Sequence, residues 1–144
     1  MNANDLKTRT KLFALRIFKL VAALPNNVAG RAIGGQLVRA GTSVGANYRA
    51  ACRGRSRAEF IAKLGVVEEE ADESAFWMEL IIEGGLLEPK RVETLLAEAK
   101  ELVAIMASSR ISASSSRVPN KNGQLANREP KMKPNRQLAI GNRK

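Results

Sequence analysis

The sequence contains no histidine and only one cysteine. The missing histidine removes the commonest general base of enzymes and the imidazole ligands of most zinc and di-iron sites. Cys52 cannot form an internal disulfide, so nothing indicates an oxidising compartment. Nearby Arg49, Arg53 and Arg55 would favour a reactive thiolate, although a small packed side chain at a helix end is the simpler interpretation. We therefore expect a non-enzymatic protein without a metal or cofactor.

Aromatic residues and long apolar runs are also scarce. Aromatics make up 4% of the chain against 44% hydrophobic residues in total, a composition that suits helices packed on helices. The longest apolar stretch, residues 12–24, is interrupted by Arg16 and Lys19, so it is too charged to span a membrane or to form a signal peptide. The expected protein is cytoplasmic and makes no membrane contact.

Acidic residues are nearly absent from the last part of the chain. Residues 111–144 hold eight Lys/Arg and one acid, whereas residues 1–110 hold 16 and 13, and the total net charge is +10. The apolar periodicity fails after Ser108, and three prolines follow. The sequence thus predicts one folded domain over residues 1–110 and a disordered basic tail over 111–144.

Four apolar stripes with helical spacing occupy the first domain. Their expected positions are Leu6, Phe13, Ile17, Leu20 and Leu24; then Ile33, Leu37, Val44, Tyr48 and Ala51; then Phe60, Leu64, Val67, Ala71, Ser74, Met78 and Ile81; and last Val92, Leu95, Ala99, Leu102 and Met106. Short connections force neighbouring helices to run antiparallel. The fold class is therefore all-α, an antiparallel up-down-up-down four-helix bundle.

Glycine and capping residues mark where these helices begin, end and approach one another. Gly34, Gly41 and Gly45 lie close to the stripe of the second helix, which indicates either a closely approaching backbone or a weak, frayed helix. Gly54 suits a left-handed helix end, and Ser56 with Glu59 forms the pattern of a capping box. Gly84-Gly85 ends the third helix and Pro89 suits the first turn of the fourth.

An acidic run over residues 68–73 offers a metal site as one hypothesis and a solvated face as the other. Carboxylate metal sites in bundles pair glutamate with histidine, which is absent here. The helical angles point Glu68, Glu69 and Asp72 away from the core and leave Glu70 on the flank of the stripe. We predict that Asn47, together with Ser43, hydrogen-bonds the half-buried Glu70 and fixes the register of two helices.

Four arginines, at positions 49, 53, 55 and 57, crowd one end of the predicted bundle. They could stabilise the dipole of one helix end, or they could form a phosphate-binding patch, because guanidinium groups match phosphate geometry. The basic tail would add salt-sensitive attraction to nucleic acid, or merely improve solubility.

Residues 40–49, 56–64 and 69–80 resemble the four-helix-bundle proteins first noted in intervening sequences of bacterial 23S rRNA genes. The matching positions are Ser43, Gly45, Asn47, Tyr48, Phe60, Glu70, Glu73 and Trp77. The resemblance covers residues 6–108 and implies a ring-like homopentamer. It also relates the chain to accessory proteins of diversity-generating retroelements, which bind nucleic acid and a reverse transcriptase. Ala50 departs from the family, which commonly has an acid there, and the basic tail is not shared.

Two functions follow as expectations. The first is an oligomeric bundle that binds RNA or DNA through Arg49, Arg53, Arg55 and Arg57, with a reverse transcriptase as a candidate partner. The alternative is a protein-interaction scaffold that does not bind nucleic acid.

Overall fold

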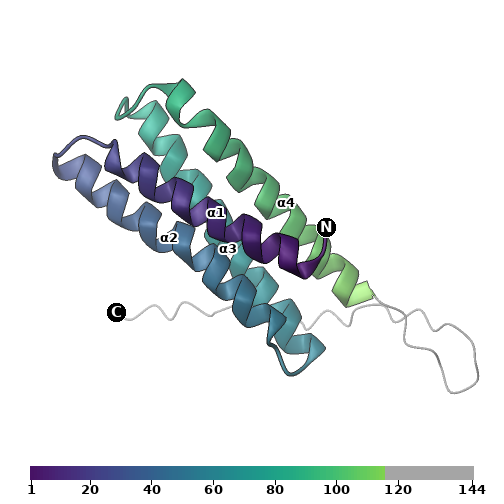
Figure 1. Cartoon of the computed structure of the whole chain (residues 1–144). Coiled ribbons are helices and arrows are strands. Elements are labelled where there is room, and N and C mark those ends of the chain that lie inside the picture. Colours follow the sequence, from purple (N-terminus) through teal and green to yellow (C-terminus); the bar gives the residue numbers. More distant parts are fainter. Residues whose placement is uncertain (116–144) are drawn as a thin grey trace, which may run out of the picture.

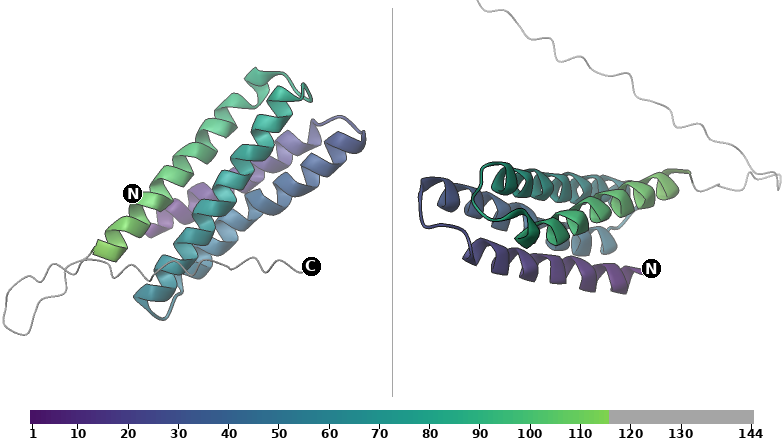
Figure 2. Two further views of the ribbon diagram at one scale, coloured as in Figure 1. Left: turned by 180° about the vertical axis from the view of Figure 1, so that it is seen from behind. Right: turned by 90° about the horizontal axis from the view of Figure 1, so that it is seen from above.

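A computed structural model of the chain describes residues 1–115 and confirms the four-helix bundle. The helices are α1 (Ala3–Ala22), α2 (Val28–Cys52), α3 (Arg57–Glu83) and α4 (Glu93–Ser115), and a single 3-10 turn, η1 (Pro89–Arg91), precedes α4. Each helix packs mainly on its neighbours in the sequence, and α1 contacts α2 far more than it contacts α4. In Figure 1, α1 lies in front and α3 lies behind it. Further views show the same arrangement (Figure 2).

The predicted apolar stripes form a single core. Phe13, Leu37, Val67 and Leu102, one from each helix, are fully buried within it. Leu24, Ile33 and Phe60 are only partly buried and pack against its edge. Thr10 also lies in the core, where its hydroxyl donates to the Leu6 carbonyl at 2.8 Å and leaves no unpaired polar atom. Burial of these faces is the main force that holds the bundle together.

The glycines of α2 allow α1 to lie close against it, although the predicted close approach of a backbone holds only at Gly45 and side chains of α1 fill the space at Gly34 and Gly41. An added Cβ at Gly41 would lie 2.8 Å from Ile17 Cγ1, and one at Gly34 would lie 3.1 Å from Val21 Cγ1. At Gly45 the nearest atom is the backbone oxygen of Thr10, at 3.4 Å. The α1–α2 contact therefore depends on missing side chains in α2.

Two of the predicted boundaries need correction. Pro89 begins the 3-10 turn and α4 starts only at Glu93, since the backbone completes that separate turn first. At the other end α4 continues to Ser115, past both the loss of apolar periodicity at Ser108 and the expected domain end at 110, because serine and alanine still permit helix there. The rest of the predicted tail, residues 116–144, lies outside the described residues.

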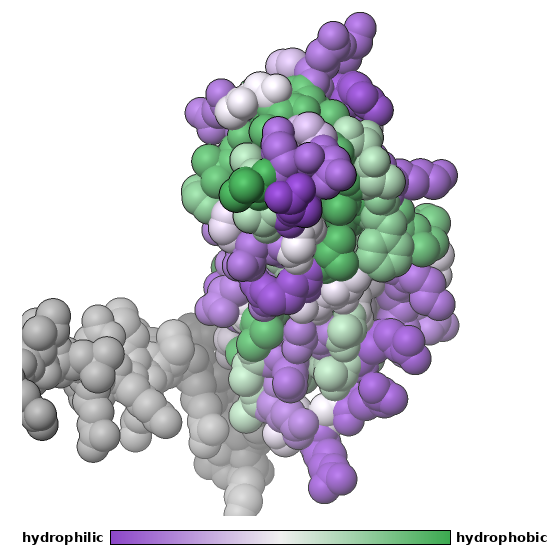
Figure 3. All heavy atoms as spheres, turned by 90° about the vertical axis from the view of Figure 1, so that its left-hand side faces the viewer, coloured by the Kyte–Doolittle hydropathy of each residue, from purple (hydrophilic) through white to green (hydrophobic). Residues whose placement is uncertain are grey.

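The surface of the described bundle includes apolar side chains. Three of them lie on α1, namely Leu12, Leu15 and Phe18, at 54%, 49% and 47%. Figure 3 looks onto the end of the bundle that holds the α1–α2 and α3–α4 connections, and there too apolar residues reach the surface among polar ones. Over residues 1–115, no helix is long and apolar enough to cross a membrane.

Candidate nucleic-acid interface

All four arginines of the predicted patch lie in the turn between α2 and α3 or in the helix ends beside it. Arg49 lies in the last turn of α2, Arg53 is its C-cap, Arg55 lies in the turn, and Arg57 is the first residue of α3. All four side chains are exposed. The patch is therefore a single corner of the bundle, which we call the arginine corner.

The backbone of this corner differs from the expectation at Gly54. Its φ is not positive, since Gly85 (φ +67) is the only glycine with a left-handed φ among residues 1–115. The predicted left-handed cap at Gly54 is thus wrong, and Arg53 closes α2 with φ −100 and ψ 7. Gly54 is needed for space instead, because an added Cβ would lie 3.0 Å from the Ala51 carbonyl oxygen.

The predicted capping box is half confirmed. Ser56 Oγ accepts a hydrogen bond from the Glu59 backbone N–H at 3.1 Å, so Ser56 caps α3. The Glu59 carboxylate, however, accepts from the Arg55 N–H at 3.1 Å and not from that of Ser56. Glu59 thus holds the turn residue Arg55 in place and occupies one backbone donor of the corner.

Arg55 and Arg57 border a shallow hollow of about 540 Å³. Its other lining residues are Ala3, Ala51, Cys52, Gly54, Ser56 and Phe60. The Arg57 Nε donates to the Ala113 carbonyl near the end of α4, which ties this guanidinium to a neighbouring helix while its terminal nitrogens remain available. Arg49 and Arg53 do not border the hollow, so the structure groups the arginines into two pairs around one corner.

The Glu59 carboxylate lies in the arginine corner, but it is bonded to the Arg55 backbone N–H and not to a guanidinium group. Over the part of the chain that the structure describes, none of its four arginines forms an ion pair. Arg49 and Arg53 lie at the carbonyl end of α2, where a cation is favourable. Arg55 and Arg57 lie at the amino end of α3, where the helix dipole favours an anion. Helix-end stabilisation therefore accounts for Arg49 and Arg53, and for Arg57 through its bond to the Ala113 carbonyl in the last turn of α4. It does not account for Arg55.

The predicted contact of Ser43 and Asn47 with Glu70 is wrong. Asn47 Nδ2 donates to the Ser43 carbonyl at 2.9 Å, and Ser43 Oγ donates to the Arg39 carbonyl at 2.7 Å, so both side chains bond within α2. The reason is register: antiparallel helices joined near Gly54 place Glu70 beside Arg39. Asn47 lies eight residues further along α2, or about 12 Å away.

Arg39 is the partner of Glu70 that the sequence reasoning missed. Its Nη1 lies 3.4 Å from Glu70 Oε1, and its Nη2 pairs with Glu73. Burial raises the pKa of the Glu70 carboxyl and the nearby Glu73 charge adds to this, while Arg39 acts in the opposite direction. Counting residues outward from the turn would have identified this pair from the sequence.

The acidic run is only partly solvated. Glu69 and Asp72 are exposed, as predicted, but Glu68 is half-buried and accepts a hydrogen bond from Arg110 Nε at 3.0 Å. The prediction for Glu68 failed because α4 extends far enough to bring Arg110 beside it. Within residues 1–115 there is no group of three or more acidic or cysteine side chains placed to hold a metal ion.

Comparison with known proteins connects this geometry to one family. The model of the 23S rRNA-intervening sequence protein family matches residues 3–108. A crystal structure of a protein of unknown function from the S23 ribosomal protein family of Bacteroides thetaiotaomicron is 33% identical in sequence, with a TM-score of 0.68. The match covers 73% of this chain and 97% of that one. A search of curated proteins found no significant match.

Proposed function

The chain belongs to the 23S rRNA-intervening sequence protein family, and we propose that it is a non-enzymatic, oligomeric bundle that binds nucleic acid through the arginine corner. The observation that carries the proposal is that Arg49, Arg53, Arg55 and Arg57 are exposed on one corner and lack acidic partners over residues 1–115. Phosphate oxygens are the natural ligands of such guanidinium groups.

The expected recognition is electrostatic and follows the phosphate backbone. No aromatic side chain that could stack on bases is exposed beside the corner within residues 1–115, because Phe60 is partly buried at its floor. The basic residues that follow α4 would strengthen the same attraction. Structured RNA and duplex DNA are therefore both candidate ligands, and affinity depends on phosphate density.

Self-association is the second part of the proposal. Leu12, Leu15 and Phe18 form an exposed strip on the outer side of α1, and an apolar strip of this kind is typical of an interface. The family resemblance suggests a homopentamer, which would place one arginine corner in each subunit. Linked corners would bind a long nucleic acid more tightly than a single corner.

The genetic role proposed for such a complex is that of an accessory protein to a reverse transcriptase. This role comes from the resemblance alone, with the arginine corner as the nucleic-acid contact. The unpaired Cys52 suits the reducing cytoplasm as the site of action.

The test of nucleic-acid binding uses a fluorescently labelled RNA hairpin and anisotropy at several salt concentrations. The triple variant R49Q/R53Q/R55Q should bind more weakly, and the slope of log affinity against log salt should fall by about one for each phosphate that is no longer neutralised. The matched control R31Q/K90Q/R91Q removes the same charge from exposed cations at the opposite end of the bundle. Equal weakening by both triples, or no binding by the natural chain at low salt, would refute the proposal.

A protein-interaction scaffold is the second candidate, favoured by the α1 strip. It predicts that Leu15→Glu and Phe18→Glu abolish association with a protein partner while R49Q/R53Q/R55Q has no effect on it. Light scattering on the same variants shows whether the strip joins copies of this chain.

A further inference from the structure

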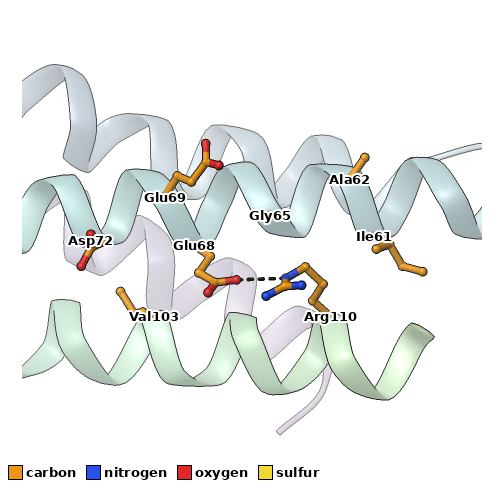
Figure 4. Close-up of a pocket in the computed structure, with 8 residues that line it drawn as sticks. All are labelled: Ile61, Ala62, Gly65, Glu68, Glu69, Asp72, Val103 and Arg110. Atoms are coloured by element: carbon orange, nitrogen blue, oxygen red, sulfur yellow. Dashed lines mark hydrogen bonds and ion pairs between the residues drawn. The ribbon is translucent and has the colours of Figure 1, made fainter. Parts of the chain in front are cut away.

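A groove between α3 and α4 is not explained by the proposed nucleic-acid contact. It has a volume of about 600 Å³ and is lined by Ile61, Ala62, Gly65, Glu68, Glu69, Asp72, Val103 and Arg110. Figure 4 shows Glu68 pointing from α3 toward α4, where it meets Arg110, and Glu69 pointing away from α4 at the edge of the groove. The groove thus combines an apolar floor with acidic walls.

The small residues of α3 keep this groove open. A Cβ added at Gly65 would have only one near neighbour, Arg110 Cδ at 3.9 Å, so close packing of the helices does not require glycine there. A glycine inside a helix weakens it relative to alanine. Its effect at this position is to leave the floor between Ile61 and Val103 uncovered.

The negative charge of the groove is only partly balanced. Arg110 pairs with Glu68, but Glu69 and Asp72 form no ion pair with any residue that the structure describes. These carboxylates belong to α3, which holds eight acidic and two basic residues. A phosphate ligand would be repelled here, so a nucleic acid is excluded as the occupant and a cationic segment is favoured.

The chain itself supplies such a segment directly after the described bundle. Residues 116–144 hold eight Lys/Arg and one acid, beginning with Arg117 and Lys121. The bond between Arg57 and Ala113 shows that α4 ends beside the start of α3, which is the Ile61 end of the groove. From there to Asp72 is about 17 Å along α3, and an extended chain covers this in about six residues.

We propose that the basic segment 117–133 docks in the α3–α4 groove of its own chain. Its lysines and arginines would neutralise Glu69 and Asp72, and Val118 or Leu125 could cover the apolar floor. The tether raises the local concentration of the segment to the millimolar range, so individually weak ion pairs suffice. Docking does not depend on the proposed nucleic-acid binding. If the protein does bind nucleic acid, the carboxylates of the groove and the phosphates of the nucleic acid compete for the same lysine and arginine side chains of the segment.

Energy transfer from Trp77, the only tryptophan, tests the docking in the full chain. An acceptor dye is attached to Asn122→Cys in a Cys52→Ser background, and Trp77 lies on the same helix as the groove. Transfer should fall by about twofold or more when salt rises to about 0.5 M. The variant E69Q/D72N should show a decrease of similar size at low salt.

A matched variant and a mixing experiment complete the test. E83Q/E88Q removes two exposed carboxylates away from the groove and should leave the transfer unchanged. A decrease in this control equal to that in E69Q/D72N, or no response to either variant or to salt, would overturn the proposal. Transfer as strong as in the doubly labelled chain, when dye-bearing Trp77→Phe chains are mixed with an excess of undyed chains that retain Trp77, would assign the groove to a second copy and also overturn it. None of these readouts involves nucleic acid, so the two proposals fail separately.

Discussion

The two helix pairs of the bundle are built by different means. Helices α1 and α2 hold eight Lys/Arg and one acid, whereas α3 and α4 hold four Lys/Arg and eleven acids. The first pair packs through glycines of α2, and the second packs through large buried side chains such as Met78, Leu102 and Met106. Charge and the use of glycine thus divide the molecule into a basic half, in which α1 and α2 approach closely, and an acidic half. Large buried side chains such as Phe13 and Leu102 fill the core from both.

This difference places the two proposed surfaces on opposite charge backgrounds. The arginine corner ends the basic half, where α2 has no acidic residue, and the groove lies in the acidic half. A phosphate group and a cationic segment would therefore bind to different faces of the same bundle.

Removing a large buried side chain from the acidic half should have the largest effect on stability. Leu102 of α4 is fully buried in the core. Leu102→Ala should therefore lower the free energy of unfolding by about 2–5 kcal/mol, because it leaves a cavity. Urea unfolding followed by circular dichroism measures the destabilisation. A cost below about 1 kcal/mol would show that the site collapses freely and that large side chains do not hold this half together.

Adding a side chain should be most damaging in the basic half. Gly41→Val should cost about 1–3 kcal/mol, since its Cβ would lie 2.8 Å from Ile17 Cγ1 and overpack the α1–α2 contact. Gly35→Ala is the matched control on the same helix. Its Cβ would meet nothing within 4 Å, so it should stabilise the protein by about 0.5–1 kcal/mol. The reverse order of these two effects would contradict the packing described for α2.

The two halves are also joined by ion pairs between α1 and α4. Arg9 Nη2 lies 2.6 Å from Glu98 Oε1, and Arg16 Nη1 lies 3.8 Å from Glu98 Oε2. Glu98→Gln should therefore cost about 1 kcal/mol at low salt and less at high salt. The control Glu88→Gln breaks only the exposed pair with Lys90 and should leave stability unchanged. Equal effects would show that position 98 does not link the halves.

The smallest expected effect concerns the pH dependence contributed by Glu70. Its pKa is raised in the folded protein, so the folded state holds the proton more tightly than the unfolded state does. Stability from this group is then present at low pH and is lost as pH rises through the folded pKa. Between about pH 4 and pH 7 the natural protein should lose stability relative to Glu70→Gln. Urea unfolding at both pH values checks the sign, and the opposite sign would contradict burial as the dominant cause.

Sequence periodicity was sufficient to predict the bundle, because each stripe of apolar residues can be buried only against another helix. The same reasoning correctly assigned a close approach at Gly45 and the end of α3 at Gly84-Gly85. It failed where two helices meet through polar side chains. The angular position of Glu70 around α3 identified it as half-buried. It gave no information about which residue of α2 lies opposite Glu70 along the helix axis, so Asn47 was assigned as the partner in place of Arg39.

The arginine corner shows the same limit. Its position at a turn followed from the pattern around Ser56, and the exposure of the four arginines agrees with the structure. The hydrogen bond from Arg57 to Ala113 could not be predicted, because it depends on α4 continuing past Ser108. The Glu68–Arg110 pair depends on the same extension, since an alanine- and serine-rich sequence allows a helix without requiring one.

Hydrogen–deuterium exchange of the full chain, with and without a structured RNA, tests the division of the surface most directly. We expect RNA to slow exchange across residues 49–57 and to leave the middle of α3, around Glu69 and Asp72, unprotected. Protection that centres on the α3–α4 groove, with residues 49–57 unchanged, would contradict this expectation.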